Sequence, residues 1–301
     1  MTDLIVSPCN ANEMEEVVRL LDQEFIYSRS RDISLARRFP NVFEHGGGSI
    51  VFVARSAGTI AGTIAVRRFT WHCQDREWQG AMIGSVFTKP QMRHQGIAAR
   101  IMGEVKSYLS AERVDFGVLW TTIPELYAKS GWIPADTAVF GTAQGRPSHK
   151  SAGSIVNRRP LADVDTDALD RFRRQSCLDY VMRRKVDYQA IPLPASRVDV
   201  LLLEHDGGLQ GYCLTGVAGS TAYVYEIVGD QQGFHLLWKS LVNDFDAIYI
   251  NAHPSTQAHG WLSAAAAVSW CAQKLAMWLP VSKEAAEVDF NRWYVPYFDR
   301  M

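Results

Sequence analysis

The sequence has few of the features that mark secreted, membrane-spanning or nucleic-acid-binding proteins. Five scattered cysteines contain no C-x-x-C pair, which excludes an obvious disulfide framework or thiolate metal site and predicts reduced thiols in a cytoplasmic protein: Cys9, Cys73, Cys177, Cys213 and Cys271. A net charge of −1 gives no field that would attract nucleic acid or an anionic membrane. Residues 1–10 are too short and polar for a signal peptide. Polar residues interrupt the most apolar window, Trp261–Leu279, so a buried helix leading into a strand is expected there.

Apolar sequence is plentiful, and it is organised in two halves. Apolar residues make up 47% of the 301 residues, which is ample for packed cores, and two domains of ordinary size are expected. We place them at residues 1–152 and 153–301. The polar segment Asn157–Asp167, which contains Pro160, is the expected linker.

One stretch of the first half has the pattern of an anion-binding turn. Ala81–Thr88 is an apolar strand that Pro90 ends, because proline cannot donate a hydrogen bond to a ladder. A basic turn, 93–96, leads into a helix that starts at Ile97, with apolar residues at helical spacing. The first amides of a helix have no partner within it, and the helix dipole favours negative charge there. Gly96 would let a phosphate approach the backbone closely.

The pattern Arg93-x-x-Gly96-x-Ala98 at this junction resembles the acyl-CoA signature of the GNAT superfamily of N-acetyltransferases. The resemblance implies that the turn holds the pyrophosphate of coenzyme A, through Arg93, His94, Gln95, Gly96, Ile97, Ala98 and Ala99. It also implies that the backbone of this strand forms hydrogen bonds with the pantetheine arm of coenzyme A, through Val86, Phe87 and Thr88. The strand on the other side of the arm would be Gly117–Trp120. An ordinary strand-to-helix turn with a capping glycine is the alternative.

The order of predicted elements in the first half matches the same fold. An α+β (α/β) architecture follows, in which each domain has a mixed, mostly antiparallel sheet with flanking helices. The expected elements are a strand at Leu4–Val6, a helix at Asn12–Phe25, an arginine-rich segment at Ile26–Phe43, a hairpin of Ile50–Ala54 and Thr59–Phe69, a loop or strand end at Trp71–Trp78, a strand at Val114–Thr121, a short helix at Ile123–Lys129 and a final strand at Trp132–Val139.

The second half is predicted to be a degenerate copy of the first. The expected elements are a helix at Ala168–Arg184, a hairpin of Val198–Glu204 and Leu209–Gly216, a strand at Thr221–Val228, a helix at Gln232–Val242 and a strand at Ala247–Ala252. At the position of the phosphate turn, Asp230 replaces the basic residue and His235 replaces the small one. An acidic side chain would repel a phosphate, so this half is not expected to bind coenzyme A.

The segment Tyr127-x-x-x-Gly131-Trp132 resembles the family element whose tyrosine protonates the sulfur of coenzyme A. Tyr127 is therefore the predicted general acid; a tyrosine that only packs its helix onto the sheet is the alternative. The base is not evident, because the strand before the turn has no carboxylate. Glu77, Asp75, the carboxylate of Met301 and ordered water remain open.

Two further groups have a structural and a functional interpretation. An arginine cluster lies on the segment that, by the resemblance, covers the acceptor site. It is either a solvated face or a contact for an anionic acceptor or the nucleotide phosphate: Arg29, Arg31, Arg37 and Arg38. The aromatic tail Phe290–Phe298 either docks onto the body or lines the acceptor pocket. No metal site is expected, since His253 and His259 lack zinc-site spacing.

Taken with the resemblance, these features predict an N-acetyltransferase that moves an acetyl group from acetyl-CoA directly to a primary amine of a small molecule. A non-catalytic acyl-CoA-binding protein and an acyltransferase with a longer acyl donor are the alternatives. Amino sugars, amino acids, polyamines, antibiotics and protein lysines remain open as acceptors. No nucleic-acid or membrane partner is expected, and the sequence does not decide the oligomeric state.

Overall fold

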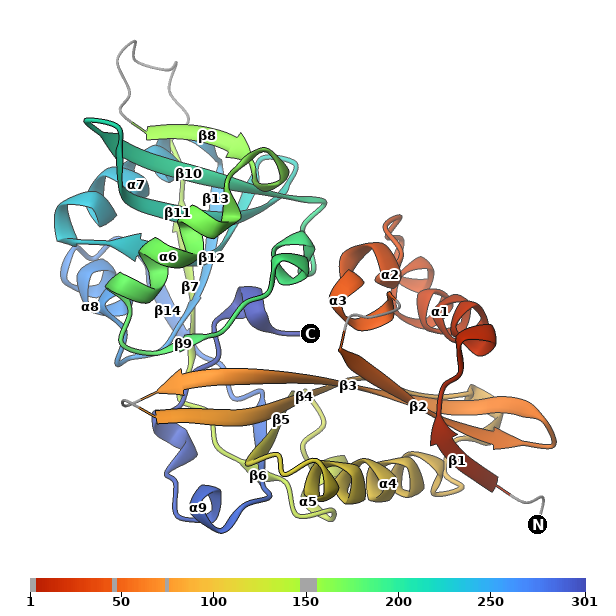
Figure 1. Cartoon of the computed structure of the whole chain (residues 1–301). Coiled ribbons are helices and arrows are strands. Elements are labelled where there is room, and N and C mark those ends of the chain that lie inside the picture. The colour runs from red at the N-terminus through yellow and green to blue at the C-terminus, as the bar shows by residue number, and fades with distance from the viewer. Residues whose placement is uncertain (1–3, 45–47, 74–75, 147–155) are drawn as a thin grey trace.

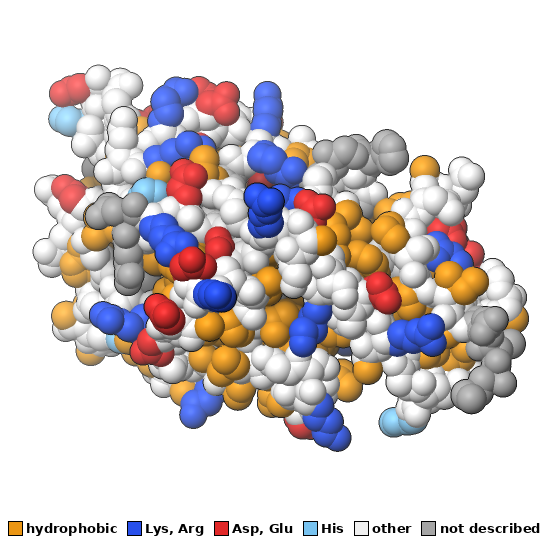
Figure 2. Space-filling view, turned by 60° about the horizontal axis from the view of Figure 1, so that its bottom comes forward, with side chains coloured by type: hydrophobic (Ala, Val, Ile, Leu, Met, Phe, Trp, Pro, Cys, Tyr) orange, Lys and Arg blue, Asp and Glu red, His pale blue; other side chains and the backbone are white. Residues whose placement is uncertain are grey.

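Two sheets with flanking helices make up the molecule, which confirms the predicted α+β class (Figure 1). A computed structural model describes residues 4–44, 48–73, 76–146 and 156–301. No helix in these ranges has both the length and the apolar character needed to cross a bilayer. On the face shown in Figure 2, acidic and basic side chains are interspersed, with apolar side chains visible between them.

The first sheet is built mainly from the N-terminal half. Its strands lie in the order β1 (Leu4–Pro8), β2 (Ser49–Ser56), β3 (Thr59–Cys73), β4 (Arg76–Thr88), β5 (Phe116–Trp120), β15 (Ala276–Pro280) and β6 (Ile133–Pro134). One face is covered by α1 (Ala11–Phe25), α2 (Leu35–Arg38) and α3 (Pro40–Phe43), and the other by α4 (Ile97–Ala111) and α5 (Glu125–Ala128) (Figure 1). A capping box between Asn10 and Glu13 fixes the start of α1.

The second sheet repeats the strand–strand–strand–helix–strand order of the first, as predicted. Its strands lie in the order β14 (Ser269–Ala272), β7 (Val139–Gln144), β13 (Ala247–Ala252), β12 (Thr221–Gly229), β11 (Gly208–Ala218), β10 (Arg197–His205) and β8 (Val156–Pro160). The helices of this half are α6 (Thr166–Ser176), α7 (Gln231–Asp244), α8 (Gln257–Ala264) and α9 (Lys283–Ala286).

The two halves exchange strands. β15 from the end of the chain pairs with β5, for example Met277 opposite Leu119, and so enters the first sheet. β7 pairs with β13 and β14 in the second sheet. The predicted final strand at Trp132–Val139 is only partly present: β6 (Ile133–Pro134) pairs with β15 in the first sheet, Trp132 packs in the core of the first half, and the longer strand that begins at Val139 joins the second sheet. Strand pairing crosses the proposed boundary at residues 152 and 153 in both directions, and that boundary remains a proposal.

Three smaller expectations also differ from the structure. The helix expected at Ala168–Arg184 ends at Ser176, because the chain then extends to form β9 (Tyr180–Val181) beside β3. The expected linker Asn157–Asp167 is mostly ordered structure, since β8 pairs with β10. Of the segment Trp71–Trp78, residues 74 and 75 lie outside the described ranges. Both tryptophans are buried and lie opposite each other in β3 and β4.

The aromatic tail packs onto the body, which confirms the structural interpretation. Phe290, Trp293 and Phe298 are all buried. The Trp293 ring lies 4.6 Å from the Trp71 ring and 5.0 Å from the Trp78 ring, measured between centroids. The chain then ends between the two lobes, over the first sheet (Figure 1).

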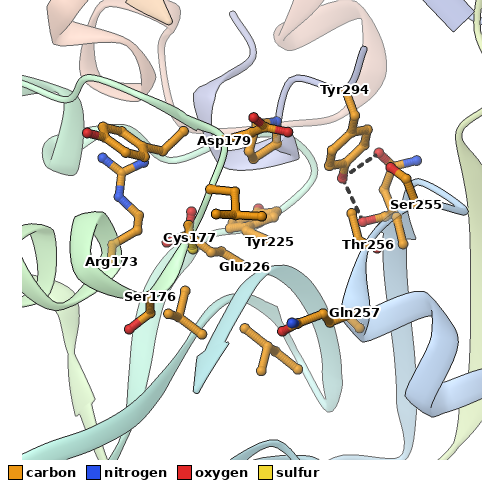
Figure 3. A pocket seen from close by; sticks show the side chains of 18 of the residues that line it. Arg173, Ser176, Cys177, Asp179, Tyr225, Glu226, Ser255, Thr256, Gln257 and Tyr294 are labelled. Atoms are coloured by element: carbon orange, nitrogen blue, oxygen red, sulfur yellow. Dashed lines mark hydrogen bonds between the residues drawn. The ribbon is translucent and has the colours of Figure 1, made fainter. Parts of the chain in front are cut away.

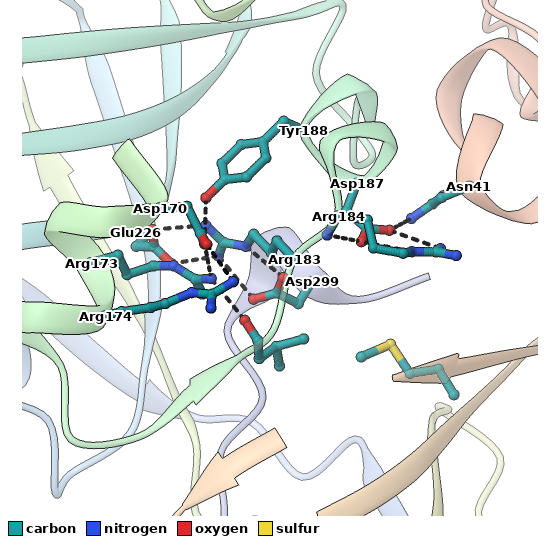
Figure 4. Close-up of polar contacts among 12 residues, drawn as sticks. Asn41, Asp170, Arg173, Arg174, Arg183, Arg184, Asp187, Tyr188, Glu226 and Asp299 are labelled. Atoms are coloured by element: carbon teal, nitrogen blue, oxygen red, sulfur yellow. Dashed lines mark hydrogen bonds and ion pairs between the residues drawn. The ribbon is translucent and has the colours of Figure 1, made fainter. Parts of the chain in front are cut away.

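A buried ionic network holds this tail in place (Figure 4). The Arg183 guanidinium donates to both Asp299 carboxylate oxygens, at 2.7 and 2.9 Å, and to both Glu226 oxygens, at 3.0 and 2.5 Å. Arg67 of β3 donates to the Asp299 backbone oxygen at 2.7 Å and to Asp187 at 3.0 Å. Because these partners come from both halves, the network fixes the tail against both sheets.

We expect this network to make stability sensitive to acid. Burial opposes ionisation of Glu226 and Asp187, but the charges of Arg183 and Arg67 outweigh it, so each carboxyl pKa lies below its usual value. A carboxyl whose pKa is lower in the folded state than in the unfolded state stabilises the folded protein at pH values above the unfolded-state pKa of about 4. This stabilisation is lost as the pH falls through the pKa of the folded state. The urea midpoint should therefore fall progressively below about pH 4. A Glu226→Gln variant should show a shallower fall, and a flat wild-type midpoint down to about pH 3 would contradict this account.

Candidate active site

β4 and β5 separate in the middle of the first sheet. Their parallel pairing runs from Gly80 opposite Phe116 to Met82 opposite Val118 and stops there. Beyond that point β4 continues to Thr88 beside β3 alone, while β5 pairs with β15 on its other side. The backbone of Val86, Phe87 and Thr88 therefore borders the opening between these strands, opposite the end of β5. An extended ligand can pair with backbone groups at such an opening.

A bulge in β4 lies at the same level and was not predicted. Ser85 has a φ of 49°, and β4 places one extra residue opposite β3 between Gly84 and Phe87. The Thr63 hydroxyl donates to the Ser85 carbonyl at 3.1 Å and so supports the irregular backbone. Serine gives no sequence signal for a positive φ, because glycine or asparagine is the usual residue there.

The turn after β4 presents backbone amides that no described residue bonds to. His94 and Gly96 both have positive φ, at 65° and 76°, and Gly96 begins α4 without a capping side chain. Within the described residues, the amides of residues 94–99 form no hydrogen bond; the Arg100 amide is the first to bond, to the Gly96 carbonyl. A Cβ at Gly96 would meet no atom within 4 Å, so the approach to these amides is open. Such a nest at a helix N-terminus is a binding site for an anionic group.

The other described helices of eight residues or more have their N-termini capped by side chains. The caps are Asn10 for α1, Asp165 for α6, Asp230 for α7 and Thr256 for α8. At α7, which corresponds to α4 in the repeat, Asp230 accepts the Gly233 amide at 2.7 Å. The N-terminus of α7 thus already has a negative charge, whereas that of α4 has none.

The Arg93 side chain points to a protein partner and not to this nest. Its guanidinium contacts Glu24 of α1 at 2.9 Å and the Thr88 carbonyl at 3.2 Å. Both side chains of the ion pair are partly exposed, so the pair adds little stability but positions the turn against α1. The role of Arg93 and His94 beside a phosphate stays a prediction.

Tyr127 lies in the core on the α4 side of the first sheet. It is 8% exposed, and its ring lies edge to face with Trp132 at 6.4 Å between centroids. Its hydroxyl has no hydrogen-bond partner in the described ranges, and burial raises its pKa above the ordinary value. Lys106 of α4 donates to the Ser130 carbonyl at 3.0 Å and holds this short helix against α4. A protonated phenol with a free hydroxyl fits the predicted general acid.

Among the candidate bases, Met301 lies against the part of β4 that borders the opening. A Cβ at Gly84 would lie 2.8 Å from the Met301 Cε and 3.7 Å from its backbone oxygen. Glu77 lies seven residues before Gly84 on the same strand, a separation of about 23 Å at 3.3 Å per residue. Asp75 falls outside the described residues. Glu77 is thus too distant from the opening, whereas Met301 forms part of its wall.

The arginine cluster is not a single solvated face. Arg38 is buried, and its guanidinium donates to the carbonyls of Ala195 at 2.7 Å and Ile191 at 3.2 Å. It therefore joins α2 to the second half and is not available to an anion. Arg29 and Arg37 are exposed, and Arg31 is partly so.

Three of the cysteines are poor nucleophiles because they are buried or partly buried. Burial raises the pKa of the Cys73 and Cys213 thiols to about 12 and that of Cys177 to about 11. Since the thiolate is the reactive form, these groups are almost wholly protonated at neutral pH. In the part of the chain that the structure describes, no three His, Cys, Asp or Glu side chains form a group that could hold a metal ion.

Known proteins show the same architecture. Residues 6–135 match the model of the acetyltransferase (GNAT) domain. A probable N-acyltransferase from Enterococcus faecalis V583 is 17% identical with a TM-score of 0.74, over 95% of this chain and 74% of that chain. A GCN5-related N-acetyltransferase from Anabaena variabilis is 14% identical with a TM-score of 0.72, over 94% and 74%. Comparison with curated protein sequences found no significant match.

A tandem GNAT protein from the clavulanic acid biosynthesis pathway matches over almost its whole length. It is 12% identical with a TM-score of 0.62, over 93% of this chain and 99% of that chain. These structural similarities show a common fold, and the range that matches the family model contains the uncapped helix α4. Residues 6–135 are therefore similar to a GNAT acetyltransferase domain, in a chain that has the fold of a tandem GNAT protein.

Proposed function

We propose that the protein is an N-acetyltransferase that uses acetyl-CoA and transfers the acetyl group directly to a primary amine of a small molecule. Residues 1–152 form the catalytic domain, and residues 153–301 form a degenerate one. The observation that carries the proposal is the row of amides at residues 94–99 that have no partner among the described residues, next to the opening between β4 and β5.

The residues at this opening fit coenzyme A. The amides of the nest, from His94 to Ala99, are donors for the pyrophosphate, and backbone groups of Val86–Thr88 are donors and acceptors for the amides of the pantetheine arm. Asp230 occupies the corresponding helix end in the second half, so a single coenzyme A site is expected per chain.

The bound thioester supplies an activated acyl carbon and a thiolate leaving group. The acceptor nitrogen bonds to this carbon, the carbon–sulfur bond breaks, and Tyr127 gives its proton to the sulfur. An alkyl amine has a pKa of about 10.4, so its neutral form costs about 4 kcal/mol at pH 7. The amine proton leaves toward the side of β4 that Met301 borders, where water or a carboxylate accepts it.

Release of free thiol tests the proposal. The wild-type chain with acetyl-CoA should release thiol in the presence of at least one class of a primary-amine panel: amino sugars, amino acids, polyamines, aminoglycosides and lysine peptides. Mass spectrometry of that acceptor should show one added acetyl group. Tight coenzyme A binding without thiol release on any acceptor would instead support a non-catalytic acyl-CoA-binding protein. Thiol release only with longer acyl-CoA donors would mean that the transferred group is a longer acyl group and not acetyl.

A further inference from the structure

A cavity of about 300 Å³ lies in the second half, apart from the opening between β4 and β5 (Figure 3). The parallel pairing of β12 and β13 stops at Val224 opposite Ile250, and the cavity occupies the space where the strands part. Ser255, in the connection from β13 to α8, lines it on the side opposite Arg173 and Ser176 of α6 (Figure 3). The volume is at the small end of the range of ligand pockets.

A tight turn places the Ser255 hydroxyl beside the ring of His253. The Thr256 amide and hydroxyl both donate to the His253 carbonyl, at 2.9 and 2.7 Å, and Pro254 occupies the second position of the turn, which favours proline. The Ser255 hydroxyl lies 2.6 Å from Nδ1 of His253. His253 is 5% exposed whereas Ser255 is exposed, so the ring is shielded from solvent while the serine can be reached from the cavity.

The partners of the imidazole determine which of its nitrogens carries the proton. Nε2 lies 3.0 Å from the Asn291 carbonyl, which can only accept, and 2.6 Å from the Thr137 hydroxyl, which itself donates to that carbonyl at 2.7 Å. Nδ1 accepts the Ser255 amide at 3.2 Å. From these contacts we assign the proton to Nε2 and a lone pair to Nδ1. Nδ1 can therefore accept the proton of the Ser255 hydroxyl.

Segments distant in sequence hold the imidazole in this orientation. Thr137 precedes β7, and Asn291 belongs to the aromatic tail. The Tyr294 ring of the same tail lies 6.0 Å from the His253 ring, measured between centroids. A serine–histidine contact that only closed a turn would need none of this support. A nucleophile, a base at hydrogen-bond distance and a third group that orients the base are the arrangement of an activated serine.

The rest of the wall fits an uncharged ester. The amides of Gln257 and Ala258, at the start of α8, form no hydrogen bond with described residues, and both residues line the cavity. Such amides can stabilise the negative oxygen that develops when a hydroxyl attacks an ester carbonyl. Apolar wall is provided by Trp261, Val224 and Ile250. The cavity therefore has space for a small apolar acyl group next to the serine.

We propose that Ser255 and His253 form a second catalytic centre, which hydrolyses small carboxylic esters with an apolar acyl group. Oγ of Ser255 bonds to the ester carbonyl carbon, and the hydroxyl proton passes to Nδ1 of His253. The carbon–oxygen bond to the alcohol then breaks, and the alcohol takes this proton as it leaves. Water attacks the acyl-serine in the same way, which releases the acid and restores the hydroxyl. Thr137 and the Asn291 carbonyl are positioning groups, because they act through the ring.

Hydrolysis of p-nitrophenyl butyrate by the full chain tests the proposal. The wild type should release p-nitrophenolate with saturation kinetics, and Ser255→Ala should lower kcat/KM by at least about 100-fold, because the nucleophile is removed. Ser263→Ala is the matched control, since Ser263 is an exposed serine of α8 that is not among the residues lining the cavity; it should keep the wild-type rate. Equal rates in Ser255→Ala and the wild type would overturn the proposal.

Covalent labelling locates the nucleophile independently of turnover. A fluorophosphonate probe should lose fluoride to the Ser255 hydroxyl, and peptide mass spectrometry should find the adduct at residue 255. His253→Gln should be labelled roughly 100-fold more slowly, with a wild-type urea unfolding transition as the control for folding. An adduct on other residues alone, or equal labelling rates in His253→Gln and the wild type, would contradict the assignment. Thiol release from acetyl-CoA should be unchanged in Ser255→Ala, so this proposal and the proposed function can fail separately.

Discussion

Replacing Tyr127 by Phe is expected to lower kcat by roughly 10²–10⁴-fold and to leave the dissociation constant for coenzyme A unchanged. The phenol is buried beside Trp132 and its hydroxyl has no partner among the described residues, so the substitution removes a proton donor and little packing. Steady-state kinetics with the best acceptor, together with coenzyme A titration, would measure both quantities.

Tyr108→Phe provides the matched control, since Tyr108 of α4 is a partly buried tyrosine that packs against Phe52 at 5.6 Å between ring centroids. It should retain wild-type kcat. If the two variants are equally active, Tyr127 is a packing residue and the sulfur is protonated by another group.

The pH dependence of kcat gives an independent check. The acid form of Tyr127 is the active one, so activity would be lost as pH rises through its pKa. Burial raises this pKa above its ordinary value of about 10. No alkaline fall in kcat is therefore expected up to about pH 9.5.

Replacing Ala99 by Glu is expected to weaken coenzyme A binding roughly 100-fold while making the folded protein slightly more stable. Ala99 is exposed in the first turn of α4. A carboxylate about 6 Å from a phosphate charge is repelled by about 3 kcal/mol at an effective dielectric constant of 20. The same carboxylate at a helix N-terminus stabilises the helix by about 0.3–1 kcal/mol. Calorimetry and urea unfolding measure the two effects separately.

The neutral isostere Ala99→Gln should bind coenzyme A nearly as well as the wild type. A matching loss in both variants would mean that side-chain size, and not charge, limits access to the turn. Unchanged affinity in Ala99→Glu would show that the diphosphate does not lie at this helix end, and the proposed function would lose its main support.

Much of the fold could be predicted from local sequence patterns. The alternation of apolar residues and the turn at residues 205–208 predicted the β10–β11 hairpin, and the spacing after Gly96 predicted α4. The uncapped start of α4 was also foreseeable, because residues 93–98 contain no side chain in a capping position. Asp230, in contrast, is a standard capping residue, and in the structure its side chain caps α7; that it excludes coenzyme A stays a prediction.

The exchange of β7 and β15 could not be predicted, because their amino acids suit either sheet. The pairing of Met277 with Leu119 joins residues more than 150 positions apart, and no local pattern specifies such a partner. The same holds for Arg38, for which the sequence suggested either a solvated face or a contact for an anion, but which bonds to carbonyls of the second half.

The sequence alone thus determined the repeated strand and helix order and the open helix end at Gly96, which depend on periodicity, capping and backbone conformation within a few residues. The candidate acid Tyr127 was suggested by the resemblance of its segment to the GNAT element. The tertiary structure decided where β4 and β5 part, that Met301 lies against Gly84, and that Arg38 bonds to carbonyls of the second half. The physical reason is that strand pairing and burial are set by contacts between distant segments, whose free energy no short stretch of the chain encodes.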